Sequence, residues 1–475
     1  MIPIVTPAQM AAIDRASAES VDVLIARAGA AVARTAIEML GGTYGRRVVV
    51  VAGPGNNGND GRAAADRLLA RGVRVQVIDA ASAPPQLPPC DLIIDAAFGT
   101  GFRGSYQTPR PSGDPLVLAV DIPSGVDGLT GAAAPGGLRA DVTVTFAALK
   151  PGLLLSSGAG RAGVVQVADI GLDGSSARAA LVEAADVRAW LPARDPGTHK
   201  WRSALWVVAG SPGMDGSAAL VASGAQRAGA GYVRQSTPGG AAGRATGLPV
   251  EVVQTTLPAV GWAPVVVEGL HRFAALVVGN GLGTGPTVAD DVASLVAGST
   301  IPTVVDADGI TALGAQAAAV TGGHVVLTPH DAEFARLSGE APGADRLSAV
   351  RDLAARLGAV VLLKGGPTIV ASPDGFVLVV TTGDARLATA GTGDVLAGII
   401  GALAAQGVVP FHAAVAAAFL HGMAGDLGWR HGLVAGDLPG LLPAVLDRLL
   451  EPPASVRAAG PMTRRPDVAA RDARS

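Results

Sequence analysis

The sequence predicts an α/β protein in two halves, each with a mostly parallel β-sheet flanked by helices. Short continuous apolar runs alternate with helical patterns along the chain, as expected for buried parallel strands joined by helices. Ala, Gly and Val dominate, with 65 Gly among 475 residues and only 3% aromatic residues. That composition is typical of α/β architecture with many tight turns between strands and helices.

The first half is predicted to be Rossmann-like. Helical patterns cover residues 8–40 and 62–71. Apolar runs predict strands within residues 47–55, 73–79, 91–99, 115–125 and 140–148. We place a domain at 1–183 and a linker at 184–198, because Pro, Asp and Gly residues interrupt the pattern there.

The second half repeats this alternation of strands and helices, and we place a second domain at 199–450. Apolar runs predict strands within residues 205–211, 275–283, 301–309, 324–330, 359–366 and 368–375. The stretch 451–475 is Pro-rich and basic. It is predicted to be a disordered tail without chemistry.

Bulk properties argue against several classes of partner. The net charge is −3 and no basic stripe occurs, so no nucleic acid is expected. Cys90 is the single cysteine, which excludes an internal disulfide and favours a reducing compartment. The apolar stretch 395–420 is interrupted by Gln406, Pro410 and His412, so no membrane helix is expected. No signal peptide is recognised at the N-terminus. We therefore expect a cytoplasmic protein. Separately, we predict a homo-oligomer.

The segment ATAGTGDVLAGIIGAL, residues 388–403, is the most informative stretch. Its turn of small residues leaves backbone amides free at a helix N-terminus, where an anion binds favourably. A carboxylate at Asp394 suits this place if it removes a proton from a hydroxyl that attacks a bound phosphoryl group. The alternative is that Asp394 only caps the helix.

The first half carries polar residues where predicted strands end. The stretch GPGNNGNDG, residues 53–61, follows a strand, and its glycines allow a ligand to approach the backbone. An Asx-rich turn without a ligand is the alternative. Asn57, Asp95 and Ser124 could converge at the carboxyl edge of the sheet, where their oxygens suit a hard cation. Arg103, in a second glycine-rich turn, could contact phosphate.

Specific stretches of the first half resemble the NAD(P)H-hydrate epimerase family (the YjeF N-terminal domain): TPAQMAAIDR, RAGAAVA, GPGNNGNDG, DAAFGTGFRG, DIPSGVDGLTG and TFAALKPGLL. The resemblance implies that Asp121 binds hydrated NADH or NADPH (NADHX, NADPHX) and is catalytic. It implies a potassium ion held by Asn57, Asp95 and Ser124. The other hydrate-binding residues that it implies are Asn56, Asn57, Gly58, Asn59, Asp60, Gly99, Thr100, Gly101, Phe102, Arg103, Gly104 and Ser105.

The second half resembles the ADP- or ATP-dependent NAD(P)H-hydrate dehydratase family of the ribokinase-like superfamily. The resemblance rests on VVAGSPGMDGSAALVASGAQRAGAGYV, VVGNGLG, VVDADGI, LTPHDAEFARL, VLLKGGPTIV, ATAGTGDVLAGII and FLHGMAGDL. It implies ADP or ATP as the phosphoryl donor, with Mg²⁺ and with Asp394 as the catalytic base. The implied nucleotide-binding residues are Lys364, Gly365, Gly366, Pro367, Thr368 and Gly393. The implied hydrate-binding residues are Ala218, Gly283, His330 and Asp394.

Three positions depart from these family patterns. Asn59 stands where a glycine is usual, and a side chain there could narrow the pocket. Trp201 follows a His-Lys pair that glycine usually follows. Asp384 lies where an Asn-Pro pair is usual, and it would repel a nucleotide unless Arg386 or a metal offsets its charge. His421 we interpret as a helix-packing or surface residue.

Three hypotheses follow from the sequence. The first is a bifunctional repair enzyme whose front half interconverts the R and S epimers of the hydrate. Its rear half then dehydrates the S epimer. The second is a ribokinase-like kinase of a small vitamin-precursor alcohol with a non-catalytic, nucleotide-binding front half. It would release a stable phosphorylated product. The third is a nucleotide sensor or scaffold without catalysis, against which the acidic residues at the strand ends argue.

Overall fold

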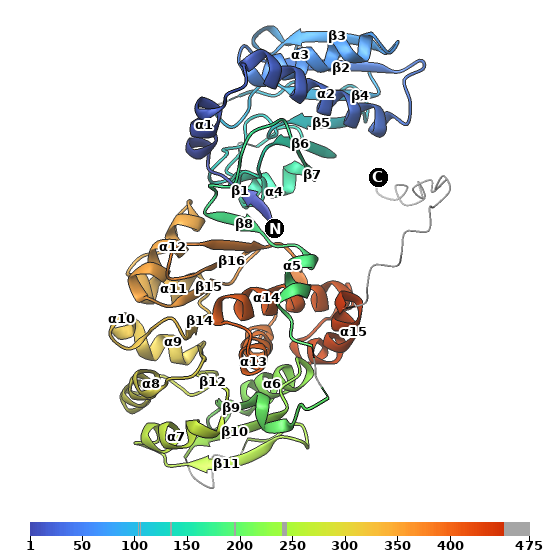
Figure 1. Ribbon diagram of the computed structural model, residues 1–475. Coiled ribbons are helices and arrows are strands. Elements are labelled where there is room, and N and C mark those ends of the chain that lie inside the picture. The colour runs from blue at the N-terminus through green and yellow to red at the C-terminus, as the bar shows by residue number, and fades with distance from the viewer. Residues whose placement is uncertain (103, 105, 134, 194–195, 240–244, 451–475) are drawn as a thin grey trace.

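A computed structural model describes the chain except residues 103, 105, 134, 194–195, 240–244 and 451–475. The predicted tail at 451–475 thus lies outside the described residues. Two sheets with helices packed on their faces make up the described part (Figure 1). This arrangement confirms the α/β prediction.

The front sheet is parallel throughout and has the strand order β3-β2-β4-β5-β6-β7. Its strands are β2 (Arg47–Ala52), β3 (Arg74–Asp79), β4 (Leu92–Ala96), β5 (Leu116–Val120), β6 (Val142–Phe146) and β7 (Val164–Ala168). Its helices are α1 (Pro7–Ala16), α2 (Val21–Leu40), α3 (Asn56–Leu69), the short 3₁₀ helix η2 (Pro151–Leu153) and α4 (Ser156–Ala162).

Two helix boundaries in the front half differ from the prediction. The pattern at 8–40 divides into α1 and α2, because Thr6 and Ser20 each cap a separate helix. Helix α3 begins at Asn56, six residues before the predicted start at residue 62. The Asn-rich stretch is therefore the first turn of a helix rather than a loop, and its free amides face the edge of the sheet.

The rear sheet has the order β1-β8-β17-β16-β15-β14-β13-β12-β9-β10-β11. Its strands are β1 (Ile2–Ile4), β8 (Ala179–Leu181), β9 (Ala204–Val208), β10 (Tyr232–Pro238), β11 (Val253–Leu257), β12 (Ala275–Val278), β13 (Thr303–Val305), β14 (Val325–Leu327), β15 (Val360–Leu363), β16 (Thr368–Ala371) and β17 (Val377–Val380). The helices of this half are α5 (Ala184–Trp190), α6 (Asp215–Arg227), α7 (Ala263–Gly269), α8 (Pro286–Gly298), α9 (Asp308–Leu313), α10 (Ala317–Val320), α11 (Asp331–Ser338), α12 (Arg346–Leu357), α13 (Thr392–Ala405), α14 (Pro410–Leu427) and α15 (Leu438–Leu450).

The two halves share this sheet and one apolar core. Strand β8 pairs in parallel with β17, and β1 pairs antiparallel with β8. Leu153 of the front half belongs to the same buried cluster as Val361 and Val379 of the rear half. The front half is therefore packed directly onto the rear half (Figure 1).

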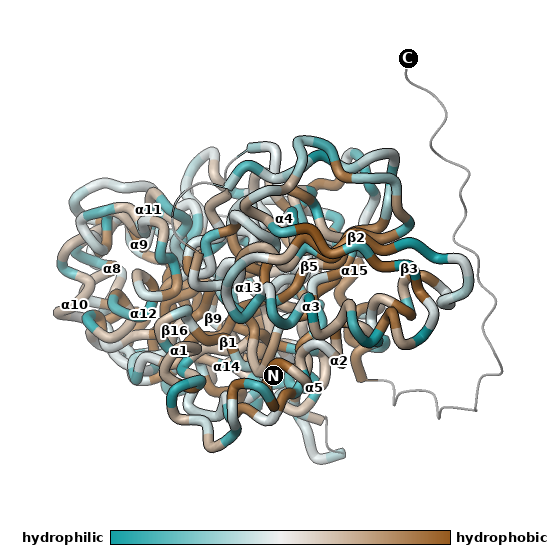
Figure 2. Tube along the Cα trace, turned by 90° about the horizontal axis from the view of Figure 1, so that it is seen from above, coloured by the Kyte–Doolittle hydropathy of each residue, from teal (hydrophilic) through white to brown (hydrophobic). Residues whose placement is uncertain are grey.

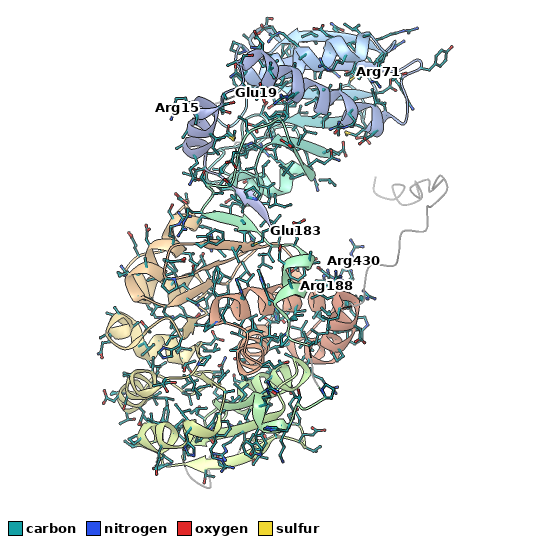
Figure 3. All side chains as sticks on the ribbon, in the orientation of Figure 1. Arg15, Glu19, Arg71, Glu183, Arg188 and Arg430 are labelled. Carbon is teal, nitrogen blue, oxygen red and sulfur yellow. The ribbon has the colours of Figure 1, made fainter. Side chains whose placement is uncertain are left out.

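The segment predicted as a linker is helical over its first part, where it forms α5. Glu183 and Asp186 form a capping box at its start, which explains a helix despite the Pro and Gly that follow. The terminal ammonium of Met1 lies 2.7 Å from Asp186. Glu183 and Arg188 mark this joining segment in Figure 3. The domain limits 1–183 and 199–450 stay predictions.

The long apolar stretch 395–420 folds into two helices, α13 and α14. Across the part of the chain that the structure describes, none of the helices has the length and hydropathy needed to cross a bilayer. The apolar residues lie instead in buried strands and helices, as the hydrophobic colour of β2 illustrates (Figure 2).

Helices α6 and α13 cross at glycines, and this crossing positions the start of α13. A Cβ atom at Gly398 would lie 2.1 Å from the carbonyl oxygen of Val221, and one at Gly224 would lie 2.6 Å from that of Val395. Both helices are therefore in backbone contact, which a larger residue would prevent.

We predict that Gly398→Ala lowers the free energy of unfolding by about 1–3 kcal/mol, because the new methyl group forces α13 away from α6. Chemical denaturation monitored by circular dichroism measures this change. Gly440→Ala on α15 is the matched control, because nothing lies within 4 Å of a Cβ atom there. The control should be neutral or stabilising by about 0.5–1 kcal/mol. Equal effects of the two substitutions would contradict the packing argument.

Candidate active sites

A cavity of about 540 Å³ lies at the carboxyl ends of the front strands. This is the edge where ligands of open parallel sheets bind. The predicted hydrate-binding residues that line it are Asn56, Asn57, Asp60, Gly99, Thr100, Gly101, Phe102 and Asp121. Lys150, which follows β6, also lines it.

Asp121 lines this cavity and has a strained backbone conformation, with φ at 66°. Its Oδ1 accepts hydrogen bonds from Lys150 Nζ at 2.6 Å and from Thr145 Oγ1 at 3.2 Å, and its Oδ2 accepts one from the Thr100 amide at 3.2 Å. Burial alone would raise the pKa of Asp121, but the Lys150 ammonium and these donors outweigh it and lower the pKa. Asp121 is therefore ionised at neutral pH.

Asp60 lines the same cavity, but its pKa is shifted in the opposite direction to that of Asp121. Burial, reinforced by the negative charges of Asp121 and Asp14, raises the pKa of Asp60 to about 8. One cavity thus contains a carboxylate at Asp121 and a carboxylic acid at Asp60. Such a pair can accept a proton at one point and donate one at another.

The three predicted potassium ligands gather around the loop that follows β4. Asp95 Oδ1 accepts a hydrogen bond from Ser124 Oγ at 2.6 Å, and the Ser124 hydroxyl also accepts one from the Phe98 amide. A Cβ atom at the adjacent Gly99 would lie 3.3 Å from the amide carbon of Asn57. Both polar atoms of the Asn57 amide are buried and have no partner within the described residues.

The other predicted residues of the front half lie elsewhere. Gly58 is buried, and a Cβ atom there would lie 1.9 Å from the carbonyl oxygen of Gly53. The side chain of Asn59 is not in the wall of the 540 Å³ cavity, so it does not narrow this cavity. Gly104 lines a neighbouring cavity of about 360 Å³. Arg103 and Ser105 lie outside the described residues.

In the rear half, a chain of polar contacts links Asp394 to Lys364. The Asn280 side-chain amide donates to Asp394 Oδ1 at 2.7 Å and to Asp306 Oδ2 at 2.9 Å. Lys364 Nζ lies 2.8 Å from Asp306 and 3.6 Å from Glu333. All five side chains therefore meet where strands β12, β13, β14 and β15 end.

Asp394 stands in the first turn of α13, as the sequence predicts. No side chain caps this helix, and its N-cap residue Gly391 is left-handed with φ at 90°. Burial raises the pKa of Asp394 to about 6 against the effect of the Asn280 hydrogen bond, and the negative charge of Asp306 adds to the increase. The carboxylate is therefore a stronger base than an exposed aspartate.

A cavity of about 770 Å³ extends from Lys364 and Gly393 toward the front half. All six predicted nucleotide-binding residues line it, namely Lys364, Gly365, Gly366, Pro367, Thr368 and Gly393. His330 lines it too, although its Nδ1 also caps α11 by accepting from the Ala332 and Glu333 amides. His330 therefore caps a helix and lines the cavity at the same time.

The three other predicted hydrate-binding residues, Ala218, Gly283 and Asp394, are not in the wall of this cavity. Ala218 is fully buried on α6, next to Ser217, which hydrogen-bonds to Asp394. The amide of Gly283 donates to Asp308.

The unusual residues near the rear site have local partners. Asp384 lines the cavity, and its Oδ1 accepts from Arg386 Nε at 2.8 Å, so Arg386 offsets its charge. Trp201 packs against Tyr232 and Phe273 and is not in the cavity wall. His421 is buried in that wall, and burial lowers its pKa to about 4, so it is neutral.

The sequence-based site assignment missed Lys150, Asn280, Asp306, Glu333 and Ser217. Three of them, Lys150, Asn280 and Asp306, follow a strand directly or by a few residues. The position of strand ends at one edge of a parallel sheet was a signal that could have identified these three. Glu333 and Ser217 lie on helices, and only the fold brings them to the site.

The pair of Lys150 and Asp121 yields a stability prediction, because Lys150 is 1% exposed and Asp121 is 13% exposed. Lys150→Met leaves a buried carboxylate without its cation, so unfolding at pH 7 should become easier by about 3–5 kcal/mol. Without Lys150, burial places the pKa of Asp121 above its unfolded value. The loss in stability should therefore grow as pH rises from 5 to 7.

Thermal unfolding at pH 5 and at pH 7 tests this prediction. The control is the double variant Lys150→Met with Asp121→Asn, which removes both charges and should recover part of the stability. A loss that is independent of pH, and that Asp121→Asn does not relieve, would exclude the charge explanation.

Comparison with known proteins agrees with this geometry. The family model described as NAD(P)H-hydrate dehydratase matches residues 205–444, and that of the YjeF-related protein N-terminus matches 21–87 and 79–152. The bifunctional NAD(P)H-hydrate repair enzyme of Moorella thermoacetica is 36% identical, across 96% of this chain and 99% of the relative. That of Mycobacterium leprae is also 36% identical, with 90% and 93% covered.

Solved structures match the rear half. The ADP/ATP-dependent NAD(P)H-hydrate dehydratase of Bacillus subtilis, co-crystallised with ATP and Mg²⁺, is 31% identical, with a TM-score of 0.51. The match covers 56% of this chain and 97% of that one. A ribokinase-like protein of Enterococcus faecalis is 21% identical, with a TM-score of 0.52 over 58% of this chain and 98% of that one, and shows the same fold. The chain belongs to the family of bifunctional NAD(P)H-hydrate repair enzymes, with an epimerase domain followed by a dehydratase domain.

Proposed function

We propose that the front half interconverts the R and S epimers of NADHX and NADPHX, and that the rear half dehydrates the S epimer with ADP or ATP. The observation that supports this most is the placement of Asp394, a buried base beside uncapped amides and beside Lys364. The relatives' names agree with the proposal, whereas the kinase and sensor hypotheses receive no support from them.

Asp394 accepts the proton of the hydrate's hydroxyl group, whose oxygen then attacks the terminal phosphorus of the nucleotide. The bond between that phosphorus and the bridging oxygen of the nucleotide breaks. When ADP is the donor, AMP is therefore the leaving group. The free amides of α13 and the Lys364 ammonium stabilise the developing charge. The phosphate ester then loses phosphate, and loss of a ring proton restores the nicotinamide double bond. Ala218 and Gly283, through their backbone, and His330 would position the hydrate, while Gly365, Gly366, Pro367, Thr368 and Gly393 would contact the nucleotide.

A divalent cation fits the residues around Lys364. Two buried carboxylates, Asp306 and Glu333, surround this single ammonium, so an incoming polyphosphate meets net negative charge. Their oxygens are of the type that Mg²⁺ prefers, and they would hold the ion. When bound, Mg²⁺ neutralises phosphate charge.

Epimerisation requires a bond at the hydroxyl-bearing carbon to break and to form again on the other face of the ring. Asp121, ionised by Lys150, is suited to accept a proton from the hydrate. Asn56, Asn57 and the amides of α3 and of the loop after β4 would orient the substrate. The ordered cavity excludes much of the solvent from this exchange.

A potassium ion fits the second group of oxygen ligands. The side chain of Asp95 is buried, which raises its pKa, and its hydrogen-bond partners are Ser124 and the Ala97 backbone. The Asn57 amide has no partner at all among the described residues. Asn57, Asp95 and Ser124 would hold the ion, which supplies charge compensation for Asp95. Homo-oligomerisation and a cytoplasmic location stay predictions.

The function is tested by recovery of absorbance at the reduced-nicotinamide band. The purified protein is mixed with Mg²⁺, K⁺ and an epimer mixture of NADPHX, with ADP, ATP or neither. Complete recovery with a nucleotide is expected, since both halves act. Recovery that stops at the S-epimer fraction would mean an inactive front half. No recovery with either nucleotide would overturn the proposal and favour the kinase hypothesis.

We predict that Asp394→Asn lowers the kcat of dehydration by at least about 100-fold while ADP binding persists, because the amide cannot accept the proton. In the wild-type enzyme, kcat should fall about tenfold per pH unit below about pH 6, where Asp394 becomes protonated. Stopped-flow absorbance across pH measures both effects. Unchanged turnover in the variant would remove Asp394 from the mechanism.

A further inference from the structure

The nucleotide cavity has one wall that the front half supplies. The residues that line it are Leu153 and Leu154 at the end of η2, Ala159 of α4, Gly163 just after α4, and Val165 of β7. The opposite wall contains Thr382, Leu387 and Ala388 of the rear half. In Figure 1, α4 lies on the side of the front half that faces β16 and α14.

The two ends of this cavity differ in chemistry. One end contains Lys364 and the start of α13 at Gly393, where phosphate charge is best stabilised. The wall from the front half is apolar, with Leu153, Leu154 and Val165 as its larger side chains. A polyphosphate gains nothing from such a wall, whereas a flat base and its ribose bury apolar surface against it.

The position of this wall is fixed by the contacts between the halves. Leu153 is 2% exposed and belongs to the core that both halves share, and Leu154 and Val165 pack against the same core. The parallel pairing of β8 with β17 joins the halves by backbone hydrogen bonds. The wall is therefore an ordered surface.

We propose that the front half completes the nucleotide site of the rear half: Leu154, Ala159 and Val165 form the wall against which the base and ribose of the phosphoryl donor pack. This inference rests on the proposed function, in which ADP or ATP occupies the cavity. It assigns specificity-determining residues for the dehydration step to the half that carries the epimerase site.

The test is Ala159→Trp in the full-length protein. Ala159 is exposed to the cavity, so an indole there occupies space that the nucleoside needs. We expect the Kd of Mg·ADP, measured by calorimetry without hydrate, to rise by about tenfold or more. The KM for ADP should rise in the same way, with kcat at saturating ADP within about twofold, because Asp394 and Lys364 are untouched.

Val164→Trp is the matched control. Val164 precedes Val165 on β7, is 64% exposed and does not line the cavity, so ADP binding should not change. Leu154→Ala is a second test that needs no added bulk, and it should raise the Kd for Mg·ADP by about threefold to tenfold through lost contact. If Ala159→Trp strongly lowers the melting temperature of the protein, the effect of Leu154→Ala on ADP binding is the deciding test.

The outcomes separate this inference from the proposed function. If the wild-type protein binds no Mg·ADP, the proposed function fails. If the wild type binds Mg·ADP and neither Ala159→Trp nor Leu154→Ala weakens binding, the composite site is excluded. A rise in the KM for hydrate alone would assign the wall to the hydrate and also overturn the inference. A fall in kcat with an unchanged KM for ADP in these variants would also overturn the inference.

Discussion

The pairing of β8 with β17 determines how the two halves of this enzyme are arranged. The strand β8 leaves the front half and joins the rear sheet in parallel, and β1 then adds to β8 at its edge. Because strand pairing fixes both distance and register, the short helices η2 and α4 are held over the rear site. The shared apolar core around Leu153 makes this placement stable, since separating the halves would expose that core to water.

In each half, a buried aspartate at the carboxyl edge of the sheet is paired with a lysine. Buried aspartates need compensation, and a lysine provides it in both halves: Lys150 beside Asp121 and Lys364 beside Asp306. Removing a charge from water is costly unless a partner of opposite sign lies close. The lysine in each half also faces a cavity, so it is available to a ligand as well as to its carboxylate.

Much of this arrangement could be predicted from the sequence. The predicted strand regions of both halves contain β2 to β6 and β9, β12 to β16, because continuous apolar runs are typical of buried parallel strands. The strands β1, β7, β8, β10, β11 and β17 were not predicted. β7, β10 and β11 contain polar as well as apolar residues, while β1, β8 and β17 are short runs of three or four residues.

The site could be predicted in part, because some of its residues stand at recognisable ends of strands and helices. Asp121 and Asp394 follow clear local patterns, a strand end and a helix N-terminus. Asn280 and Asp306 act through contacts with each other and with Asp394, and these contacts join residues up to 114 positions apart. The wall formed by Leu154 and Val165 had no sequence signal, because apolar residues look alike whether they face a core or a ligand.

The two proposed catalytic aspartates show how one residue type would serve two reactions. Asp121 has an ammonium group at 2.6 Å, which outweighs its burial and lowers its pKa. Asp394 instead has the neutral amide of Asn280 beside it and the negative Asp306 nearby, so its pKa rises to about 6. A carboxylate that must take a proton from a poorly acidic hydroxyl benefits from the higher pKa. The amide of Asn280 keeps that carboxylate oriented without the charge that would weaken it as a base. The ammonium of Lys364 lies further along the chain of contacts, beyond Asp306, where the phosphate would bind.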